Sequence, residues 1–191
     1  MQADHYSSQR LMMRPFKQTD SDALTLGLQE PLVSCQLANV PDDYQPQHAQ
    51  QFIAAFGTPD SQNFALAICL TKRPQMLIGG FGVHPLPIQA SDFICQRLHV
   101  GEEDKPLLSL GYWIAHPHWG HGYASEMLNV MRPAVAKKFN RSVIGAIVLQ
   151  HNIAWLRVLA KSGFSNLGMI RLSESKQAGK MAHVLAWQSH Y

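Results

Sequence analysis

The sequence has few charges, no basic block and no long apolar run, and each shortage excludes a class of protein. Charged residues make up 15% of the 191 positions, and the net charge is only +3. Because lysines and arginines form no long consecutive block, the charge pattern does not favour a nucleic-acid partner. No apolar stretch approaches the roughly 20 residues of a membrane-spanning helix, so we expect no membrane partner.

Cysteines are also scarce. Cys35, Cys69 and Cys95 are odd in number and form no CxxC pair, which favours reduced thiols. Cys69 lies in an apolar run and is expected to be buried. The first residues show no basic stretch followed by an apolar one, so we expect a cytoplasmic protein. The ten histidines include His116, His118 and His121, but their spacing matches no strong zinc pattern, and we expect no metal.

The composition is that of a folded domain in which strands and helices alternate. Apolar residues make up 46% of the chain, enough for a sizeable core. Strands are expected at 11–16, 64–70, 76–83, 107–115, 143–149, 164–172 and 181–187, and helices at 23–28, 47–56, 125–139 and 152–162. This order predicts a single α/β domain, 1–191, with one central mixed sheet.

Four segments need separate interpretation. Positions 31–46 are turn-rich and predict irregular structure. The segment 85–106, with two early prolines and the acidic run 102–104, predicts a long insertion loop, either a lid or a surface loop without a role. Pro133 should kink or restart its helix. The glycines of 79–82 predict bulges or a close approach of backbone.

The most informative segment is 111–124. It is a short apolar strand, a turn marked by Pro117, and a loop with Gly120 and Gly122 that opens a helix. Free backbone N–H groups and the helix dipole attract an anion at such a helix start. Glycine lets a phosphate approach the backbone because it has no Cβ. The segment therefore predicts a phosphate-bearing ligand.

Three motifs together resemble the GNAT superfamily, most closely its RimJ/RimL-type N-acetyltransferases. They are the opening Arg10–Leu24, the run Gly111–Glu126, and the run Asn152–Phe164, which ends in Gly163-Phe164. The resemblance covers roughly positions 9 to 187, and the segment after His84 fits it poorly. It implies an α/β (α+β) fold with a mixed, mostly antiparallel central sheet and helices on both faces.

The resemblance also implies acetyl-CoA as co-substrate. The family's diphosphate loop falls on Trp119, Gly120, His121, Gly122, Tyr123 and Ala124. Trp119 stands where the family has Gln or Arg. By analogy, Ile114 and Ala115 offer main-chain groups to the pantetheine arm, and Asn152 lies beside the cofactor.

Three positions depart from the family pattern. Trp155 replaces a usual Ser, and its indole could crowd the cofactor groove, stack on the cofactor or fill the core. Ser109 stands where many relatives carry Glu, and Leu159 where others carry Tyr. His84 and Ser109 are the catalytic candidates, relaying a proton through water. The alternative for His84 is a plain strand-end polar residue.

These observations predict an N-acetyltransferase that moves acetyl to a primary amine by direct attack in a ternary complex. The acceptor is a protein N-terminus or a small amine, and the protein is a monomer or homodimer. A non-catalytic acyl-CoA-binding regulatory protein is the main alternative, because the usual Glu and Tyr are missing. A third possibility is an α/β interaction domain that binds no CoA.

Overall fold

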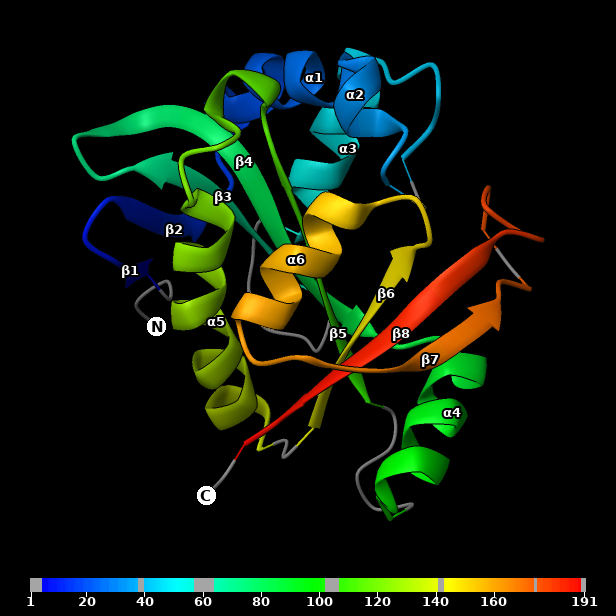
Figure 1. The fold of residues 1–191 in the computed structure, drawn as a ribbon. Helices are drawn as coiled ribbons and strands as arrows, with labels where there is room; N and C mark the ends of the chain where they lie inside the picture. Colours follow the sequence, from blue (N-terminus) through cyan, green and yellow to red (C-terminus); the bar gives the residue numbers. More distant parts are fainter. Residues whose placement is uncertain are drawn as a thin grey trace. The chain divides into compact units, whose positions relative to one another are not determined.

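The computed structural model describes residues 5–37, 40–56, 64–101, 107–140, 143–173 and 175–189. Figure 1 shows the helices and strands along the chain. The chain divides into two compact units. Unit 1 contains Met1–Val83 and Gly111–Val130, and unit 2 contains His84–Leu110 and Met131–Tyr191. Two strands and one helix pass from one unit to the other. The acidic run 102–104, expected as part of a loop, lies outside the described residues.

Unit 1 is built from an antiparallel ladder and three helices. Its elements are β1 (Tyr6–Ser7), β2 (Leu11–Pro15), the 3-10 turn η1 (Gln18–Asp20), α1 (Ser21–Gln29), α2 (Pro31–Ser34), α3 (Pro46–Phe56), β3 (Phe64–Leu70) and β4 (Arg73–Pro85). It also holds the end of β5 (Leu108–Ile114), the turn η3 (His116–His118) and the start of α5 (Tyr123–Phe139). Strands β1 to β4 pair antiparallel in chain order.

The core of unit 1 follows from the continuous apolar run of β3. Ala65, Ala67 and Cys69 lie on one face and pack against buried side chains of α1, α2 and α3. Leu66 and Ile68, on the other face, are fully buried as well. A strand buried on both faces reads as an unbroken apolar run rather than an alternating one. Cys69 is a buried free thiol, as predicted, and burial raises its pKa to about 11.

The glycines of β4 make room for Trp113. A Cβ built on Gly80 would lie 2.5 Å from the indole Nε1 of Trp113, and one on Gly79 would strike the Trp113 backbone oxygen. A Cβ built on Gly27 of α1 would lie 2.5 Å from the same indole. The predicted close approach of backbone at 79–82 is confirmed, and its cause is a tryptophan 33 positions further on from Gly80.

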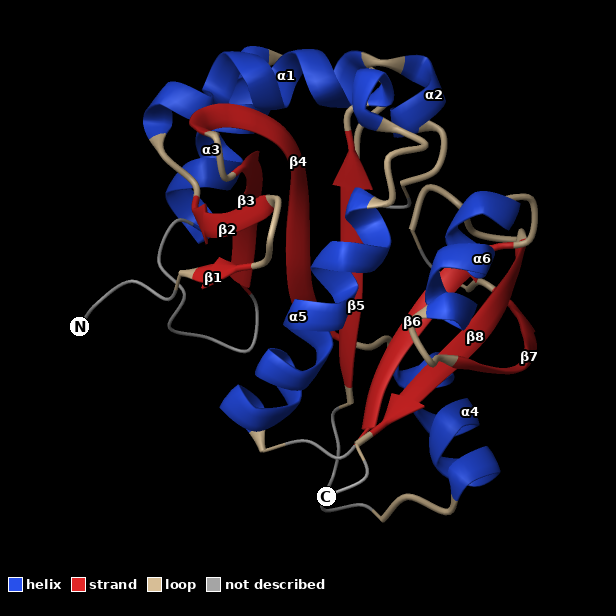
Figure 2. Ribbon diagram, turned by 60° about the vertical axis from the view of Figure 1, so that its left-hand side comes forward, coloured by secondary structure: helices blue, strands red, loops and turns tan. Residues whose placement is uncertain are grey.

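Unit 2 combines the other end of the sheet with α4. Its elements are the end of β4, α4 (Ile88–Leu98), the start of β5, the end of α5, β6 (Val143–Leu149), α6 (Ile153–Lys161), β7 (Ser165–Arg171) and β8 (Met181–Gln188). Strand β6 pairs parallel with β5 at Leu108 and Ser109, and antiparallel with β8. Figure 2 shows β6, β8 and β7 next to one another, as their pairing requires.

Strand β6 is an inner strand, which explains its apolar sequence. Its Val143 and Ile147 pack with α4, together with Ile170 of β7 and Val184 of β8. A Cβ on Gly145 would lie 2.9 Å from Ile94 of α4. The glycine in the middle of this strand therefore lets α4 approach closely.

The prediction of a loop at 85–106 is wrong for half of that segment, because Ile88–Leu98 form the helix α4. Ala90, Ser91, Ile94 and Cys95 are its buried face. Their spacing is helical, but alanine, serine and cysteine give a weak apolar signal. Pro31–Ser34 of the expected irregular segment are also helical. At Pro133 the expected restart is absent, since α5 runs through it.

The strand order is β1-β2-β3-β4-β5-β6-β8-β7. Only the β5–β6 pairing is parallel among the pairings whose register is described. The predicted α/β fold with a mixed, mostly antiparallel sheet is confirmed. Across the part of the chain that the structure describes, no helix combines the length and apolarity needed to cross a membrane.

Candidate functional site

The candidate site in unit 1 is the turn that joins β5 to α5. The strand ends at Ile114, and Pro117 lies in the single 3-10 turn His116–His118. The Ala115 N–H donates to the Ile78 carbonyl of β4 at 2.8 Å, and the Ala115 carbonyl accepts from the His118 N–H at 2.8 Å. The turn is therefore fixed to β4 at one end before the glycine loop begins.

Gly120 and Gly122 both have φ of +77°, a left-handed conformation that favours glycine. Within the described residues, the five N–H groups of Gly120–Ala124 donate no hydrogen bond. A Cβ on Gly120 would meet nothing within 4 Å. Five free donors beside open space at the start of a 17-residue helix are what an anionic ligand requires.

A layer of side chains flanks this loop. The His121 and Tyr123 rings stack with centroids 5.5 Å apart and planes 11° apart. The guanidinium of Arg10 covers the Tyr123 ring, 4.8 Å from its centroid. The His121 Nδ1 lies 2.7 Å from the Trp119 carbonyl oxygen, and since a carbonyl only accepts, Nδ1 is the donor.

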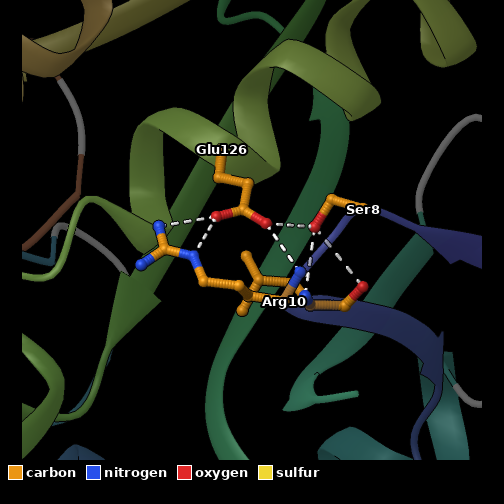
Figure 3. Close-up of polar contacts among 4 residues, drawn as sticks. Ser8, Arg10 and Glu126 are labelled. Atoms are coloured by element: carbon orange, nitrogen blue, oxygen red, sulfur yellow. Dashed lines mark hydrogen bonds and ion pairs between the residues drawn. The ribbon is translucent and has the colours of Figure 1, made fainter.

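Arg10 also pairs with Glu126 in the first turns of α5 (Figure 3). The Glu126 carboxylate accepts from the Ser8 hydroxyl at 2.7 Å, the Arg10 N–H at 2.9 Å and the Arg10 Nε at 2.7 Å. Burial alone would raise the pKa of Glu126, but these hydrogen bonds and the Arg10 charge outweigh it and lower the pKa. The carboxylate is thus held ionised at neutral pH.

His118 closes the 3-10 turn that precedes the glycine loop. Burial lowers the pKa of His118, and the neighbouring His121 lowers it further. The His118 imidazole is therefore neutral over a wider pH range. Among the described residues, no three His, Cys, Asp or Glu side chains gather as a metal site would require.

The main-chain groups of Ile114 and Ala115 are already engaged. The Ala115 N–H and carbonyl make the two bonds given above, and the Ile114 carbonyl accepts from the Trp119 indole. A carbonyl oxygen has a second lone pair. The pantetheine contact predicted from the resemblance therefore remains available to the carbonyls, whereas the Ala115 N–H is occupied.

Asn152 lies in unit 2 as the N-cap of α6. Its side-chain oxygen accepts from the Trp155 N–H at 3.0 Å, which satisfies one free donor of the helix start. The asparagine therefore has a structural role whether or not it touches a cofactor. Trp155 is half-buried, and Leu159, at the position of the family's Tyr, is 1% exposed.

The two catalytic candidates also lie in unit 2. Ser109 is 3% exposed, on β5 opposite Gly145 of β6. The His84 Nδ1 lies 3.0 Å from the Pro85 carbonyl oxygen, so Nδ1 carries the proton. In this tautomer Nε2 is the acceptor nitrogen. Within the described residues, no hydrogen bond joins His84 to Ser109.

Ser8, Arg10 and Glu126 belong to this site but were not predicted from the sequence. Arg10 and Glu126 stand inside the quoted motifs, but they are 116 positions apart. The available signal was a carboxylate in the first turns of the helix that carries the anion loop. A negative charge there repels an anion bound at the loop unless a partner compensates it.

Comparison with known proteins agrees with the fold and the motifs. The N-acetyltransferase YoaA of Bacillus subtilis (strain 168), described as uncharacterized, is 37% identical over 62 residues. That similarity spans 32% of this chain and only about a third, 35%, of YoaA.

Two solved structures cover nearly the whole chain. An acetyltransferase of the GNAT family from Bacillus anthracis has a TM-score of 0.75 at 16% identity, over 97% of this chain and 98% of that one. RimJ of Mycobacterium smegmatis, in complex with CoA-disulfide, has a TM-score of 0.75 at 17% identity, over 98% of this chain and 88% of that one. These likenesses show that the fold is that of GNAT proteins.

The family itself is shown by the sequence. The family model described as "Acetyltransferase (GNAT) domain" matches residues 10–165, which include the opening strand, the glycine loop and Asn152. With the fold and the loop geometry described above, this match identifies the chain as a member of the GNAT acetyltransferase family.

Proposed function

We propose that this protein is an N-acetyltransferase that moves acetyl from acetyl-CoA to a primary amine by direct attack. The observation that carries the proposal is the loop of Gly120–Ala124, with five free N–H donors and two left-handed glycines. Membership of the GNAT family supports an acyltransferase. The RimJ structure of similar fold was solved with a CoA derivative.

The residues of the loop fit a diphosphate. The backbone N–H groups of Gly120–Ala124 would donate to its oxygens, and the dipole of α5 favours negative charge there. The open space at Gly120 admits the phosphate without a clash. Asn152, capping α6 in unit 2, is proposed as a second cofactor residue on the resemblance of its motif alone.

The catalytic roles are proposed for His84 and Ser109. When bound, acetyl-CoA supplies a thioester whose carbonyl carbon accepts the amine while its C–S bond breaks. The amine must be neutral to attack, so a base must take up its proton. The His84 Nε2 is an available acceptor because Nδ1 is held by the Pro85 carbonyl. The Ser109 hydroxyl is proposed to pass the proton through water.

The proposed acceptor is a primary amine, either a protein N-terminus or a small molecule. We propose direct attack without a covalent enzyme intermediate. In the described structure Cys69 and Cys95 are buried, and no cysteine lies in the loop segment 111–126. A buried thiol with a raised pKa is a poor nucleophile, which supports the direct route at Cys69.

A second candidate, a non-catalytic acyl-CoA-binding protein, is favoured by one observation. Ser109 and the buried Leu159 replace the Glu and Tyr that the resemblance leads us to expect. Such a protein would keep the diphosphate loop and lack turnover.

The test combines binding with turnover. Calorimetry with CoA and acetyl-CoA should give saturable binding, and amine and peptide panels should reveal acceptors that release thiol from acetyl-CoA. Binding without thiol release for any acceptor would favour the second candidate. Absence of binding by the folded protein would contradict both candidates.

Two variants test the catalytic roles. His84→Gln and Ser109→Ala should each lower kcat by about 10²-fold or more, with little change in the Kd for CoA. His84→Gln should also change the pH dependence of kcat. His99→Asn is the matched control, since His99 is exposed in the same unit and has a φ of +54° that asparagine tolerates.

A further inference from the structure

Glu126 lies at an unfavourable place for a protein that holds a diphosphate. It is in the first turns of α5, and its N–H donates to the Gly122 carbonyl at 3.1 Å, one turn back in the anion loop. A carboxylate this close to the loop repels a phosphate. Unless its charge is compensated, it counteracts the free N–H groups and the helix dipole.

Arg10 supplies the compensation. Its Nη2 lies 2.6 Å and its Nε 2.7 Å from the same carboxylate oxygen, Oε2, while its backbone N–H and the Ser8 hydroxyl bind Oε1. Figure 3 shows the carboxylate between these donors. The Glu126 side chain is 18% exposed, and the Arg10 side chain 47%. The pair is thus partly shielded from solvent on the carboxylate side.

The same guanidinium touches the anion loop itself. It covers the face of Tyr123, whose ring stacks on His121. Its Nη2 lies 3.7 Å from the place where a Cβ on Gly122 would be. One side chain from the segment before β2 therefore contacts the loop and neutralises the carboxylate beneath it.

We propose that Arg10 is a positioning residue for CoA binding, which cancels the charge of Glu126 beside the diphosphate loop and holds Tyr123 and His121 against that loop. The inference rests on the proposed function, because it takes the loop's ligand to be the diphosphate of CoA. Arg10 acts through Glu126 and Tyr123. A guanidinium that served as a direct phosphate ligand would not depend on the charge of Glu126.

Three variants separate charge cancellation from other roles. Arg10→Ala leaves the Glu126 charge uncompensated and should weaken CoA binding about tenfold. Glu126→Gln removes the charge and keeps an oxygen that accepts hydrogen bonds, so it should bind CoA at least as tightly as the wild type. The double variant Arg10→Ala/Glu126→Gln should recover most of the affinity lost by Arg10→Ala.

The measurement is the Kd for CoA by calorimetry at low and moderate salt, with circular dichroism to check folding. Arg73→Ala is the matched control, because Arg73 is an exposed arginine on β4 of the same unit and changes the net charge equally. It should leave the Kd within about twofold of the wild type. If Arg10→Ala does not fold, the Kd of Glu126→Gln for CoA tests the inference by itself, because it should be no higher than that of the wild type.

Two results would overturn the inference while leaving the proposed function intact. The first is that Glu126→Gln weakens CoA binding as much as Arg10→Ala does. The ion pair would then only stabilise the local structure. The other is the double variant binding no better than Arg10→Ala, which would make Arg10 a direct ligand. A folded wild-type protein that does not bind CoA would overturn the proposed function, and the inference with it.

Discussion

The indole Nε1 of Trp119 donates a hydrogen bond to the carbonyl oxygen of Ile114 at 2.6 Å. The side chain folds back over five residues and closes the turn between β5 and α5. It remains 43% exposed, and the His116 ring meets it edge-on, 5.0 Å away. Trp119 therefore shapes the turn that presents the N–H groups of the loop.

Replacing Trp119 by phenylalanine keeps an aromatic ring and removes the indole donor. We expect the Kd for CoA to rise about fivefold, because one hydrogen bond of about 1 kcal/mol no longer holds the turn. Calorimetry measures the Kd, and the unfolding temperature should fall only slightly. An unchanged Kd would show that the turn keeps its geometry without this bond.

Gly120→Ala should weaken CoA binding and also cost about 1–2 kcal/mol of stability, because its φ is +77°. Gly179→Ala is a matched control. Gly179 has φ of +84° and, like Gly120, open space where a Cβ would lie. Thermal unfolding should show similar losses for both variants, whereas only Gly120→Ala should raise the Kd for CoA. Equal Kd values would contradict a ligand at this loop.

Gly80→Ala should destabilise the fold by about 1–3 kcal/mol, because its Cβ would collide with the Trp113 indole. The same substitution in a Trp113→Leu background should cost less, since the colliding ring is absent. Denaturant unfolding of the four proteins in this cycle gives the coupling. If the losses in free energy of unfolding of the two single variants simply add, the Cβ at position 80 does not collide with the Trp113 ring.

Asn152→Ala removes the N-cap of α6 and should cost about 1 kcal/mol, or roughly 2–4 °C in unfolding temperature. Asn152→Ser keeps a capping oxygen and should restore the stability. The CoA affinity of Asn152→Ser then tests the proposed cofactor role by itself. If Asn152→Ser is as stable as the wild type and binds CoA with the same Kd, then Asn152 caps α6 and does not contribute to cofactor binding.

The contribution of Glu126 to stability should depend on pH. Its pKa is lowered in the folded state from an ordinary value of 4.5. The folded protein therefore binds this proton less readily than the unfolded chain, and the stabilisation is present above pH 4.5 and lost as the pH falls through the folded pKa. The unfolding temperatures of the wild type and Glu126→Gln should differ most near pH 7 and converge in acid. A constant difference would contradict the lowered pKa.

Local sequence patterns predicted most elements of this protein. The strand expected at 143–149 and the helices expected at 125–139 and 152–162 occur close to those bounds as β6, α5 and α6. The apolar side chains of α5 that repeat at helical spacing are all buried: Met127, Leu128, Met131 and Val135. These features depend on residues a few positions apart, so the sequence alone determines them.

The sequence also determined the loop, because glycine is the residue that adopts a left-handed conformation at Gly120 and Gly122 without strain. It did not reveal α4, because three of the four residues on its buried face are small and give a weak apolar signal. Packing against β6, β7 and β8 identifies this helix.

The tertiary structure alone decided how the loop is supported. Arg10 and Glu126 are 116 positions apart, and no local pattern says that the segment before β2 reaches the first turns of α5. Trp113 and Gly80 are likewise joined only by the fold. Short-range periodicity reflects the geometry of a single helix or strand. These long-range pairs instead depend on which elements become neighbours, and that is fixed only when the whole chain folds.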